Sequence, residues 1–475
     1  MRKLAVLAVV ACVGGMVVGV AGPRAAQAAT LATGDSRSVT EPTVPAVCAT
    51  VSADLTTPGS RTFSGAQESA PPDTSRIQGA LDDCHGTGEA VELAAGGGDT
   101  AFLSGPLTVG GGEVLLVDAG VTLFASLNAS QYQVAGKPTC GTVQTSSGGC
   151  TPFITVNGAG AGVEGTRSGS GAQGRIDGRG DLALYGGSES WWDLALDAKN
   201  SGEKQNNPRL IVASADSFTL YDVDLLNGPN FHVVFQNAKG FTAWGVRIKT
   251  PDTAKNTDGI DPSGATDVTI ADSSIQDGDD GVAIKGGSAS ANITIRGNHF
   301  YGTHGISIGS ETNGGVTNVL VENNTVQGTD SSGTASSSNN GLRIKSDSSR
   351  GGTVSQITYQ GTCLTGVKYL LDFDPYYSSS TGSEIPYFTD IVVDGARAVS
   401  STSGAQSVLD GYSSAYPLGL TLENVSFDAT STTAQYADIG VYDADITASG
   451  TGVTVTSVSG SGSVPSCSFP GFPSL

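Results

Sequence analysis

The sequence predicts an all-β protein folded as a right-handed parallel β-helix, a solenoid of short strands. Its 475 residues include 67 glycines, too many for a helical protein, while 38% hydrophobic residues suffice for a core. A unit of short strand, polar or glycine corner and second short strand recurs without helical periodicity. The eight units begin at Phe218, Phe241, Val268, Ile293, Val319, Ile357, Ile391 and Leu420. Repeats of about 20–50 residues are typical of solenoids, whose stacked coils bury one continuous core.

Two other repeat architectures fit less well. A propeller blade needs about 40 residues and four strands, and a leucine-rich repeat would show its Leu/Asn signature. Earlier stretches also fit the β-helix, since "VLLVDAGVTLFAS" from Val114 predicts the first coils. "TSRIQGALDDC", Thr74 to Cys84, predicts a short amphipathic helix with Ile77, Leu81 and Cys84 on one face. We expect this helix to cap the open end of the core.

The first 28 residues predict a secretory signal peptide. Arg2 and Lys3 form a basic start, an apolar run continues to about Val20, and Ala26-Gln27-Ala28 is a cleavage site of the A-x-A type. No later segment is long and apolar enough to span a bilayer. We therefore expect a secreted, extracellular protein.

The chain is accordingly expected to have three parts. Residues 1–28 form the signal peptide, residues 29–47 a flexible N-terminal segment, and residues 48–475 a single β-helix domain. One domain can hold this many residues because a solenoid grows by adding coils rather than by enlarging a globular core.

Six cysteines follow the signal peptide: Cys48, Cys84, Cys140, Cys150, Cys363 and Cys467. An even number in an exported chain predicts three disulfides, although six cysteines allow fifteen pairings. Order along the chain favours Cys48–Cys84, Cys140–Cys150 and Cys363–Cys467. The sequence has no C-x-x-C pair, which argues against a zinc site.

The charge of the chain limits its partners. It has 45 acidic and 24 basic residues and a net charge of −21 at pH 7. This acidity argues against binding to nucleic acid or to an anionic membrane. Any anionic ligand would need a local basic patch. We expect the chain to act as a monomer.

Candidate functional residues lie about one coil apart. In chain order they are Asp258, then Asp279 with Asp280, then His304, then Arg343 with Lys345. Equivalent positions in adjacent coils lie about 4.8 Å apart, so these residues become neighbours. Paired carboxylates suit acid/base chemistry, because like charges raise the pKa of one member. The basic pair, two residues apart on one strand, would project together and hold an anionic group.

Asp279 and Asp280 are adjacent in sequence, and adjacent strand residues point to opposite faces. A bend or bulge is therefore needed if both are to face one cleft. Gly278 and Gly281 are expected to supply the backbone freedom for it.

Four motifs, "NTDGID", "DGDDGVAIK", "GTHGISIGS" and "NGLRIKSD", resemble in this order the pectin-hydrolysing polygalacturonases of glycoside hydrolase family 28. "GRIDGRG" with Trp191-Trp192, "NGPNFHVVF", and "DPYY" followed by "GSEIPYFTDI" also match, and the family places the tryptophan pair in packing. The resemblance covers most of the chain and is strongest to bacterial endo-acting members. It implies hydrolysis of α-1,4 bonds between galacturonic acid units of de-esterified pectin.

The resemblance also implies catalytic roles. Asp279 resembles the general acid that protonates the leaving oxygen. Asp258 and Asp280 resemble the pair that positions and deprotonates the attacking water, and His304 would tune the protonation of these carboxylates. An inverting reaction needs room for that water, with acid and base about 6.5–9.5 Å apart.

Substrate-binding residues follow in the same way. Arg343 and Lys345 resemble the clamp on the galacturonate carboxylate. Tyr377 matches a tyrosine that contacts substrate, with Tyr376 as a close rival. Gly281 stands where many family members have a cysteine, a departure that touches none of these roles.

Other polar residues near the motifs are interpreted as structural. Asp261 and Asp277 are expected to shape turns, and His232 and His299 to serve as structural histidines. Lys285 lies near the candidate site without an assigned role.

No metal and no cofactor is expected. The stretch "DGDDG" suggests calcium, but an EF-hand loop starting at Asp277 would place Ser288 rather than Glu at its twelfth position.

Four alternative functions fit parts of the sequence. An exo-acting polygalacturonase would differ in the loops that close the cleft. A rhamnogalacturonan hydrolase of the same family is disfavoured by His304 and the Arg343–Lys345 pair, which suit an acidic sugar. A pectate lyase would need calcium and an arginine base. A non-catalytic adhesin would not require three aspartates, a histidine and a basic pair to be aligned.

Overall fold

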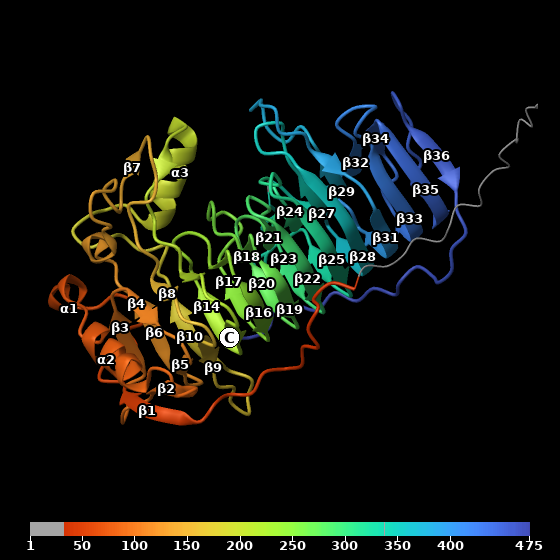
Figure 1. Ribbon diagram of the computed structural model, residues 1–475. Coiled ribbons are helices and arrows are strands. Elements are labelled where there is room, and N and C mark those ends of the chain that lie inside the picture. The colour runs from red at the N-terminus through yellow and green to blue at the C-terminus, as the bar shows by residue number, and fades with distance from the viewer. Residues whose placement is uncertain (1–32, 337) are drawn as a thin grey trace, which may run out of the picture.

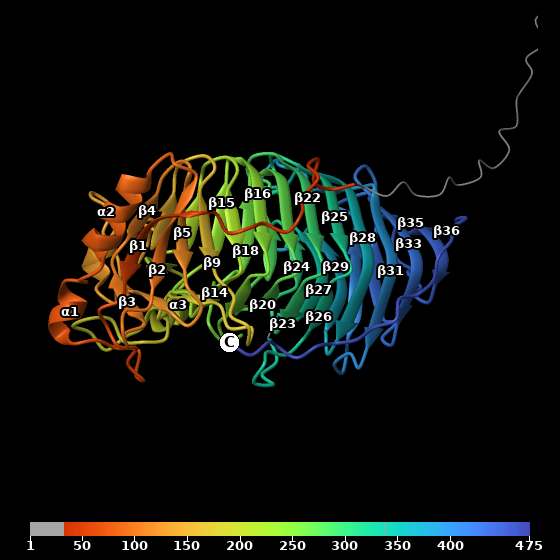
Figure 2. The same ribbon diagram turned by 90° about the horizontal axis from the view of Figure 1, so that it is seen from below.

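A computed structural model describes residues 33–336 and 338–475, and the signal peptide predicted for 1–28 lies outside them. The chain winds into an elongated stack of coils with parallel strands, running from β1 at one end to β36 at the other (Figures 1 and 2). The predicted all-β parallel β-helix is confirmed.

Two large parallel sheets form the walls of the coil. The 23-stranded sheet contains β1 (Val47–Ser52), β2 (Glu89–Ala94), β3 (Ala101–Ser104), β5 (Glu113–Val117), β6 (Thr122–Ala125), β9 (Gly162–Gly165), β10 (Gly174–Asp177), β13 (Thr219–Tyr221), β14 (Val223–Leu226), β16 (Lys239–Trp244), β17 (Arg247–Lys249), β19 (Thr266–Ala271), β20 (Ser274–Gln276), β22 (Ser290–Arg296), β23 (His299–Tyr301), β25 (Val316–Glu322), β26 (Thr325–Gln327), β28 (Thr353–Thr365), β30 (Tyr387–Phe388), β31 (Ile391–Val399), β33 (Leu418–Phe427), β35 (Ala437–Ala444) and β36 (Thr454–Ser457). The 11-stranded sheet contains β4 (Leu107–Val109), β8 (Ile154–Val156), β12 (Ile211–Ala213), β15 (Val233–Gln236), β18 (Ile260–Ser263), β21 (Val282–Ile284), β24 (Ile306–Ile308), β27 (Asn340–Lys345), β29 (Tyr369–Asp374), β32 (Gln406–Asp410) and β34 (Thr432–Gln435).

The remaining elements are few. They are the antiparallel pair β7 (Val143–Gln144) and β11 (Lys204–Gln205), the helices α1 (Gly65–Ser69), α2 (Thr74–Cys84) and α3 (Trp191–Ser201), and the short 3-10 helix η1 (Ala129–Tyr132).

The corners recognised in the sequence repeat are left-handed turns. The fifth residue of each of the eight units has a positive φ, between 48° and 74°. These residues are Asp222, Gly245, Asp272, Gly297, Asn323, Gly361, Gly395 and Asn424. Glycine, asparagine and aspartate tolerate this region best. The residue at each corner therefore allows the chain to turn from one strand into the next, which produces the repeat.

Stacked side chains of one kind fill the core between the sheets. The Phe241 ring lies 5.2 Å from that of Phe218 and 5.0 Å from that of Phe235, both in stacked orientation. Each fully buried aliphatic or aromatic side chain stabilises the fold by about 1.5–3 kcal/mol. The same coil-to-coil stacking that builds the core also brings outward-facing side chains of successive coils into line.

The predicted capping helix is confirmed with its predicted bounds. Ile77, Leu81 and Cys84 of α2 are fully buried against the first coils. At α3, a capping box between Ser190 and Asp193 begins the helix, and Gly202 in the left-handed region ends it.

All three predicted disulfides are present, namely Cys48–Cys84, Cys140–Cys150 and Cys363–Cys467. They fit a protein that folds in an oxidising compartment. Among residues 33–336 and 338–475, the longest helices have 11 residues and none could cross a membrane.

Both ends of the described chain lie across the large sheet. We call residues 33–46 the N-terminal strap and residues 458–475 the C-terminal strap (Figure 2). The N-terminal strap crosses several coils, with Asp35 accepting a hydrogen bond from Thr269 and Arg37 donating to the Phe241 carbonyl at 2.7 Å in both cases. The flexible segment expected over 29–47 is thus hydrogen-bonded to the sheet in its described part.

The C-terminal strap runs over the other strands of the same sheet. Cys467 ties it to β28, and Tyr301 on β23 donates to the Gly471 carbonyl at 3.2 Å. Further along, Arg247 on β17 donates to the Ser474 carbonyl at 2.9 Å.

Candidate active site

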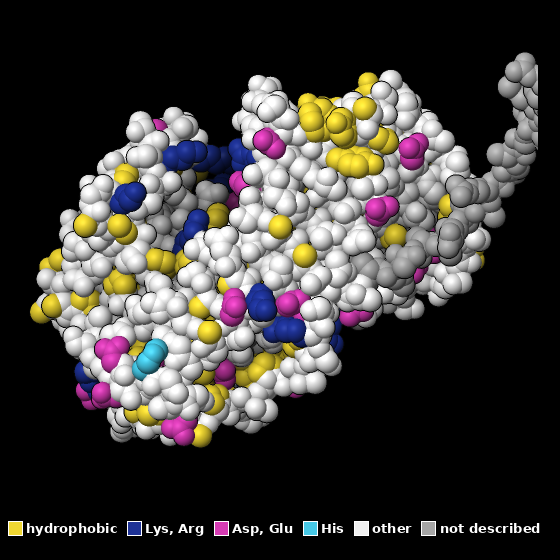
Figure 3. Space-filling view, viewed as in Figure 1, with side chains coloured by type: hydrophobic (Ala, Val, Ile, Leu, Met, Phe, Trp, Pro, Cys, Tyr) yellow, Lys and Arg dark blue, Asp and Glu magenta, His cyan; other side chains and the backbone are white. Residues whose placement is uncertain are grey.

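A cleft lies over the 11-stranded sheet, between α3 with β7 on one side and the loops beside β29 and β32 on the other (Figures 1 and 3). It encloses a groove of about 560 Å³ lined by Asp279, His304, Arg343 and Tyr377. Four more cations line it: Lys199, Lys204, Arg209 and Lys255. Figure 3 shows basic side chains gathered in this hollow. The local basic patch that an anionic ligand would need therefore exists in this acidic protein.

Four adjacent strands of the 11-stranded sheet carry the predicted residues to this cleft. Asp258 precedes β18, Asp279 and Asp280 precede β21, and His304 precedes β24. Arg343 lies within β27, beside Ser307 of β24 in the register. The order of these strands in the sheet is β18, β21, β24, β27, so the predicted ladder of residues is realised.

The bend between β20 and β21 turns both adjacent aspartates toward the cleft. The Asp277 carboxylate accepts a hydrogen bond from the Asp279 amide at 2.9 Å, which confirms the turn role of Asp277. Neither Gly278 nor Gly281 has a positive φ. A Cβ on Gly278 would lie 1.9 Å from the Ala254 carbonyl, and one on Gly281 would lie 2.5 Å from the Phe300 ring. The glycines are therefore needed for close packing, not for the unusual dihedrals that the sequence predicts.

Asp279 is paired with His304. The Nδ1 atom of His304 lies 3.0 Å from Asp279 Oδ1, and the Asn256 side chain donates to the other carboxylate oxygen at 3.4 Å. Burial tends to raise the pKa of Asp279, but the His304 hydrogen bond and charge, aided by Lys345, lower the pKa overall. Of the three site aspartates, Asp279 is the most open to the cleft.

Asp280 is held by cations and a hydroxyl. Lys345 Nζ lies 2.7 Å from one carboxylate oxygen, and Ser307 Oγ donates to the other at 2.8 Å. Arg343 approaches to 3.8 Å. Burial raises the pKa of Asp280, but the Lys345 charge outweighs this effect and keeps the pKa lowered. This carboxylate is therefore ionised in the free protein.

Asp258 lies in a different electrostatic setting. It is buried, its Oδ1 has no hydrogen-bond partner among the described residues, and its other oxygen lies 3.7 Å from Lys285 Nζ. Burial and the charges of Asp261 and Asp279 raise the pKa of Asp258 well above the usual value. The three carboxylates thus differ in how readily each takes up a proton.

Two residues near Asp258 were not assigned to the site from the sequence. Asp261 lies buried within β18 and not in a turn, so the turn interpretation is wrong for it. Burial raises the pKa of Asp261 to about 7, although the Lys285 charge opposes this. Lys285 faces both Asp258 and Asp261, because it continues β21 beside β18 in the register with Ser263. The alternation of outward-facing positions along β18 could have indicated Asp261, since it is two residues from outward-facing Ser263.

The sequence model of the family described as "Glycosyl hydrolases family 28" matches residues 101–445. The chain belongs to this family. It is therefore a glycoside hydrolase, and the family predicted from the four motifs is confirmed.

Relatives of this family 28 hydrolase cover most of its length. It is 43% identical to an endo-polygalacturonase of Pectobacterium carotovorum subsp. carotovorum, over 84% of this chain and 91% of the relative. It is 40% identical to a polygalacturonase of Ralstonia solanacearum, over 90% of this chain and 91% of the relative. A solved polygalacturonase from Erwinia carotovora ssp. carotovora matches with a TM-score of 0.74 and 39% identity, over 89% of this chain and all of that one.

The basic pair of the family 28 hydrolase is covered by one tyrosine. The Tyr377 ring centroid lies 5.2 Å from the Arg343 guanidinium and 5.0 Å from Lys345 Nζ, both close enough for cation–π contact. Arg343 also pairs with Asp372 at 3.1 Å. Tyr376 turns away and stacks on Tyr412. Of the two rival tyrosines, Tyr377 is the one at the basic pair.

The other two histidines discussed above lie outside the carboxylate cluster. His232 is buried and bonded to Thr250 at 2.9 Å, and burial lowers its pKa to about 4. His299 lies on the large sheet with its ring 2.8 Å from Thr325 Oγ1. Both contacts fit the structural roles predicted for these residues.

Asp279, Asp280 and His304 could together approach a metal ion, since one ligand atom of each lies within 4.8 Å of the others. Lys345 already holds a carboxylate oxygen of Asp280 at 2.7 Å, and its charge would repel a cation there. Catalysis without metal stays a prediction for this family 28 hydrolase.

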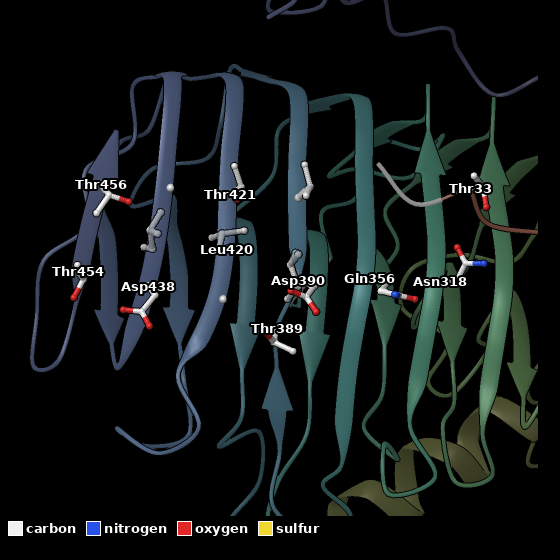
Figure 4. A pocket seen from close by; sticks show the side chains of 15 residues that line it. Thr33, Asn318, Gln356, Thr389, Asp390, Leu420, Thr421, Asp438, Thr454 and Thr456 are labelled. Atoms are coloured by element: carbon white, nitrogen blue, oxygen red, sulfur yellow. The ribbon is translucent and has the colours of Figure 1, made fainter. Parts of the chain in front are cut away.

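A larger groove of the hydrolase lies elsewhere. A groove of about 870 Å³ crosses the outer face of the large sheet near its C-terminal coils (Figure 4). Its polar lining consists of threonines, Asn318, Gln356, Asp390 and Asp438, without lysine, arginine or histidine among the described residues. An anionic sugar would meet only like charge in this groove, which makes it unsuitable as the substrate site.

Proposed function

We propose that this chain is a secreted, inverting endo-polygalacturonase that hydrolyses α-1,4 bonds between galacturonosyl units of de-esterified pectin. The observation that carries the proposal is the placement of Arg343 and Lys345 beside three buried or half-buried aspartates in one basic cleft. A galacturonosyl unit combines a carboxylate with a glycosidic bond, and the cleft offers partners for both.

The charge distribution supports an acidic polysaccharide as substrate. The net charge of −21 repels a polyanion from most of the surface, whereas the lysines and arginines of the cleft attract it. The planar guanidinium of Arg343 matches a carboxylate geometrically, and Lys345 adds a second cation. Tyr377 over this pair would exclude water from the bound carboxylate.

The three aspartates have different catalytic roles. Asp279, the most open of the three, donates a proton to the leaving oxygen. Asp258 and Asp280 hold a water molecule between them and the sugar and take up its proton during attack. Asp280 is suited to this because Lys345 keeps it ionised. Direct attack by water gives inversion without a covalent intermediate.

The lowered pKa of Asp279 in the free protein is consistent with this role once substrate binds. His304 and Lys345 lower that pKa, so the Asp279 carboxylate favours its ionised form in the absence of substrate. A galacturonate carboxylate on Arg343 and Lys345 would neutralise part of that positive charge. Substrate binding would therefore raise the pKa of Asp279 and favour the proton on its carboxylate.

Internal cleavage is supported by an open groove and by the similarity to the endo-polygalacturonase of Pectobacterium. Secretion is supported by the predicted signal sequence and by the three disulfides.

Product analysis tests the proposal as a whole. With polygalacturonate as substrate and EDTA present, we expect undiminished release of saturated oligomers of several lengths with new reducing ends. Viscosity is expected to fall early, as internal cleavage requires. Calcium-dependent release of unsaturated products would instead identify a lyase.

The stereochemistry of the first product tests the arrangement of the carboxylates. We expect the newly formed reducing end to appear first as the β-anomer, because water attacks the face opposite the leaving group. Proton NMR during the first minutes of hydrolysis distinguishes the two anomers before they equilibrate. Early retention of the α-configuration would show that a carboxylate, not water, attacks first.

Lys285→Met is expected to move the acid limb of the kcat/KM profile to higher pH by about one unit. Asp258 must be ionised to accept a proton, and its pKa is already raised by burial, Asp261, Asp279 and Asp280. Removing the opposing charge of Lys285 raises that pKa further, and an opposite charge within about 4–6 Å typically shifts a pKa by 1–3 units.

The matched variant Lys285→Arg keeps the charge and is expected to show a smaller displacement. An acid limb that stays in place in Lys285→Met would exclude Lys285 from control of Asp258. Profiles of kcat/KM between about pH 3 and 8, measured below the thermal midpoint of each variant, provide the comparison.

A further inference from the structure

The outer face of the 11-stranded sheet changes charge sign beyond β27. Lys345 of β27 lies beside Asp374 of β29 in the register. The pairing of β29 with β32 brings Asp410 next to Asp374, and Asp410 in turn lies beside Gln435 of β34. Steps of about 4.8 Å between strands place these side chains in one row that continues from Lys345 across the sheet. We call Asp374 and Asp410 the acidic row.

The basic pair has its ion-pair partners outside the acidic row, although the charge of Arg343 partly offsets the rise that burial causes in the pKa of Asp374. Arg343 forms its ion pair with Asp372, and Lys345 contacts Asp280 at 2.7 Å. Asp410 accepts a hydrogen bond from Gln435 at 3.1 Å, but burial and the charge of Asp374 raise its pKa. A second carboxylate brought to this place would meet repulsion, whereas a hydroxyl group could donate a hydrogen bond to either aspartate.

The loops that follow β29 and β32 carry three tyrosines, which we call the tyrosine wall: Tyr376, Tyr412 and Tyr416. The rings of Tyr376 and Tyr412 are stacked, with centroids 5.5 Å apart and planes inclined by 23°. The Tyr376 hydroxyl donates to the Tyr412 carbonyl, which fixes the stack. Tyr416 packs edge-on against Tyr387 at 5.7 Å.

The wall is exposed although its rings pack against other tyrosines. Tyr376 is 43% and Tyr416 is 40% exposed. Figure 3 shows hydrophobic side chains gathered on the lobe that borders the cleft on the side of the C-terminal coils. A contiguous exposed aromatic patch next to a cleft commonly marks a binding surface. Aromatic faces suit the C–H face of a pyranose ring, and the nearby aspartates suit its hydroxyls.

We propose that the tyrosine wall and the acidic row bind an uncharged sugar unit, a methyl-esterified galacturonosyl residue, in the same polysaccharide chain whose acidic unit is held by Arg343 and Lys345. This inference rests on the proposed function. Esterification removes the charge that the acidic row would repel and adds a methyl group that the tyrosine rings can cover. The enzyme would then favour bonds near the border between esterified and free stretches.

Two variants test the inference on two substrates, fully de-esterified polygalacturonate and a partly methyl-esterified form of it. Asp410→Lys replaces repulsion by attraction, and Tyr376→Ala removes the stacked ring. For each variant, the ratio of kcat/KM on the esterified substrate to that on the free acid is expected to fall about tenfold, equivalent to about 1.4 kcal/mol. Asp438→Lys, on the outer face of the large sheet, makes the same charge change away from the cleft and is expected to leave the ratio unaltered (Figure 4).

The products provide a second readout. Mass spectrometry of oligomers from the esterified substrate is expected to find methyl esters enriched at a fixed distance from the new chain end, on one side of the cut only. The inference would be overturned if, in both variants, the ratio of kcat/KM on the esterified substrate to that on the free acid stayed within about twofold of wild type. Equal exclusion of methyl esters on both sides of the cleaved bond would overturn it as well.

Two further outcomes separate this inference from the proposed function. Wild-type enzyme that fails to cleave even free polygalacturonate would refute the proposed function itself. Variants that lose activity on rhamnose-containing oligomers and not on esterified ones would overturn the choice of methyl-esterified galacturonate as the bound unit.

Discussion

Asp279→Asn is expected to lower kcat/KM on polygalacturonate by about 10²–10⁴-fold, the range that a positioned general acid contributes. The amide keeps the shape of the side chain and its contact with His304, but it has no proton to give to the leaving oxygen. Asp258→Asn and Asp280→Asn are expected to cause losses of similar size by weakening water activation. Initial rates of reducing-end formation measure all three.

The thermal midpoint of unfolding provides the control for these three variants. The pKa of Asp258 is raised in the folded protein, so stability is greatest below its unfolded pKa and falls as pH rises through the folded pKa. At pH 7, Asp258→Asn removes this penalty and is expected to raise the thermal midpoint, with the gain vanishing at acidic pH. Asp438→Asn, an exposed acid on the large sheet, serves as the matched substitution. An inactive variant with a lowered midpoint would point to unfolding instead of lost chemistry.

Arg343→Ala and Lys345→Ala are each expected to cost about 2 kcal/mol or more in transition-state stabilisation, the scale for truncating a partner of a charged hydrogen bond. The substrate carboxylate would lose a cation in a protein that otherwise repels it. Arg343→Lys is not expected to restore full activity, because lysine cannot form the planar two-bond contact or the same stacking on Tyr377.

Separate measurement of KM and kcat distinguishes a role in binding the substrate carboxylate from a structural role. We expect a raised KM on polygalacturonate in the Arg343 and Lys345 variants, and little change for Arg397→Ala on the exposed face of β31. Near-normal kcat/KM in both alanine variants would mean that the acidic group of the substrate is held elsewhere.

Much of the fold could be predicted from the sequence because the same residue pattern recurs in each coil. Asn323 and Gly361, for example, occupy the same corner position in their units, and both have the positive φ that favours these residue types. The ladder of candidate residues could be predicted for the same reason, since residues one coil apart must stack. The motif residues Asp258 and His304 could therefore be placed without coordinates.

The residues that were missed depend on coil lengths and on loops outside the repeat. Lys285 faces Asp258 only because β18 and β21 pair in one specific register, which variable loop lengths conceal in the sequence. The stacking of Tyr376 on Tyr412 joins two loops that share no pattern. Residues 33–46 show no periodicity, and their contacts are with side chains and carbonyls several coils away.

The two straps alter how the molecule can come apart. A plain solenoid contacts only its nearest coils, so it can fray coil by coil from either end. Here each strap is fastened to coils far from its own end of the stack. Arg37 holds the Phe241 carbonyl, Arg247 holds the Ser474 carbonyl, and Cys467 is bonded to β28. Opening the last coils therefore requires the release of contacts near the middle of the stack. A protease would find few loosely held segments at either end of the described chain, and the working lifetime of the protein would be set by one large, slow unfolding event.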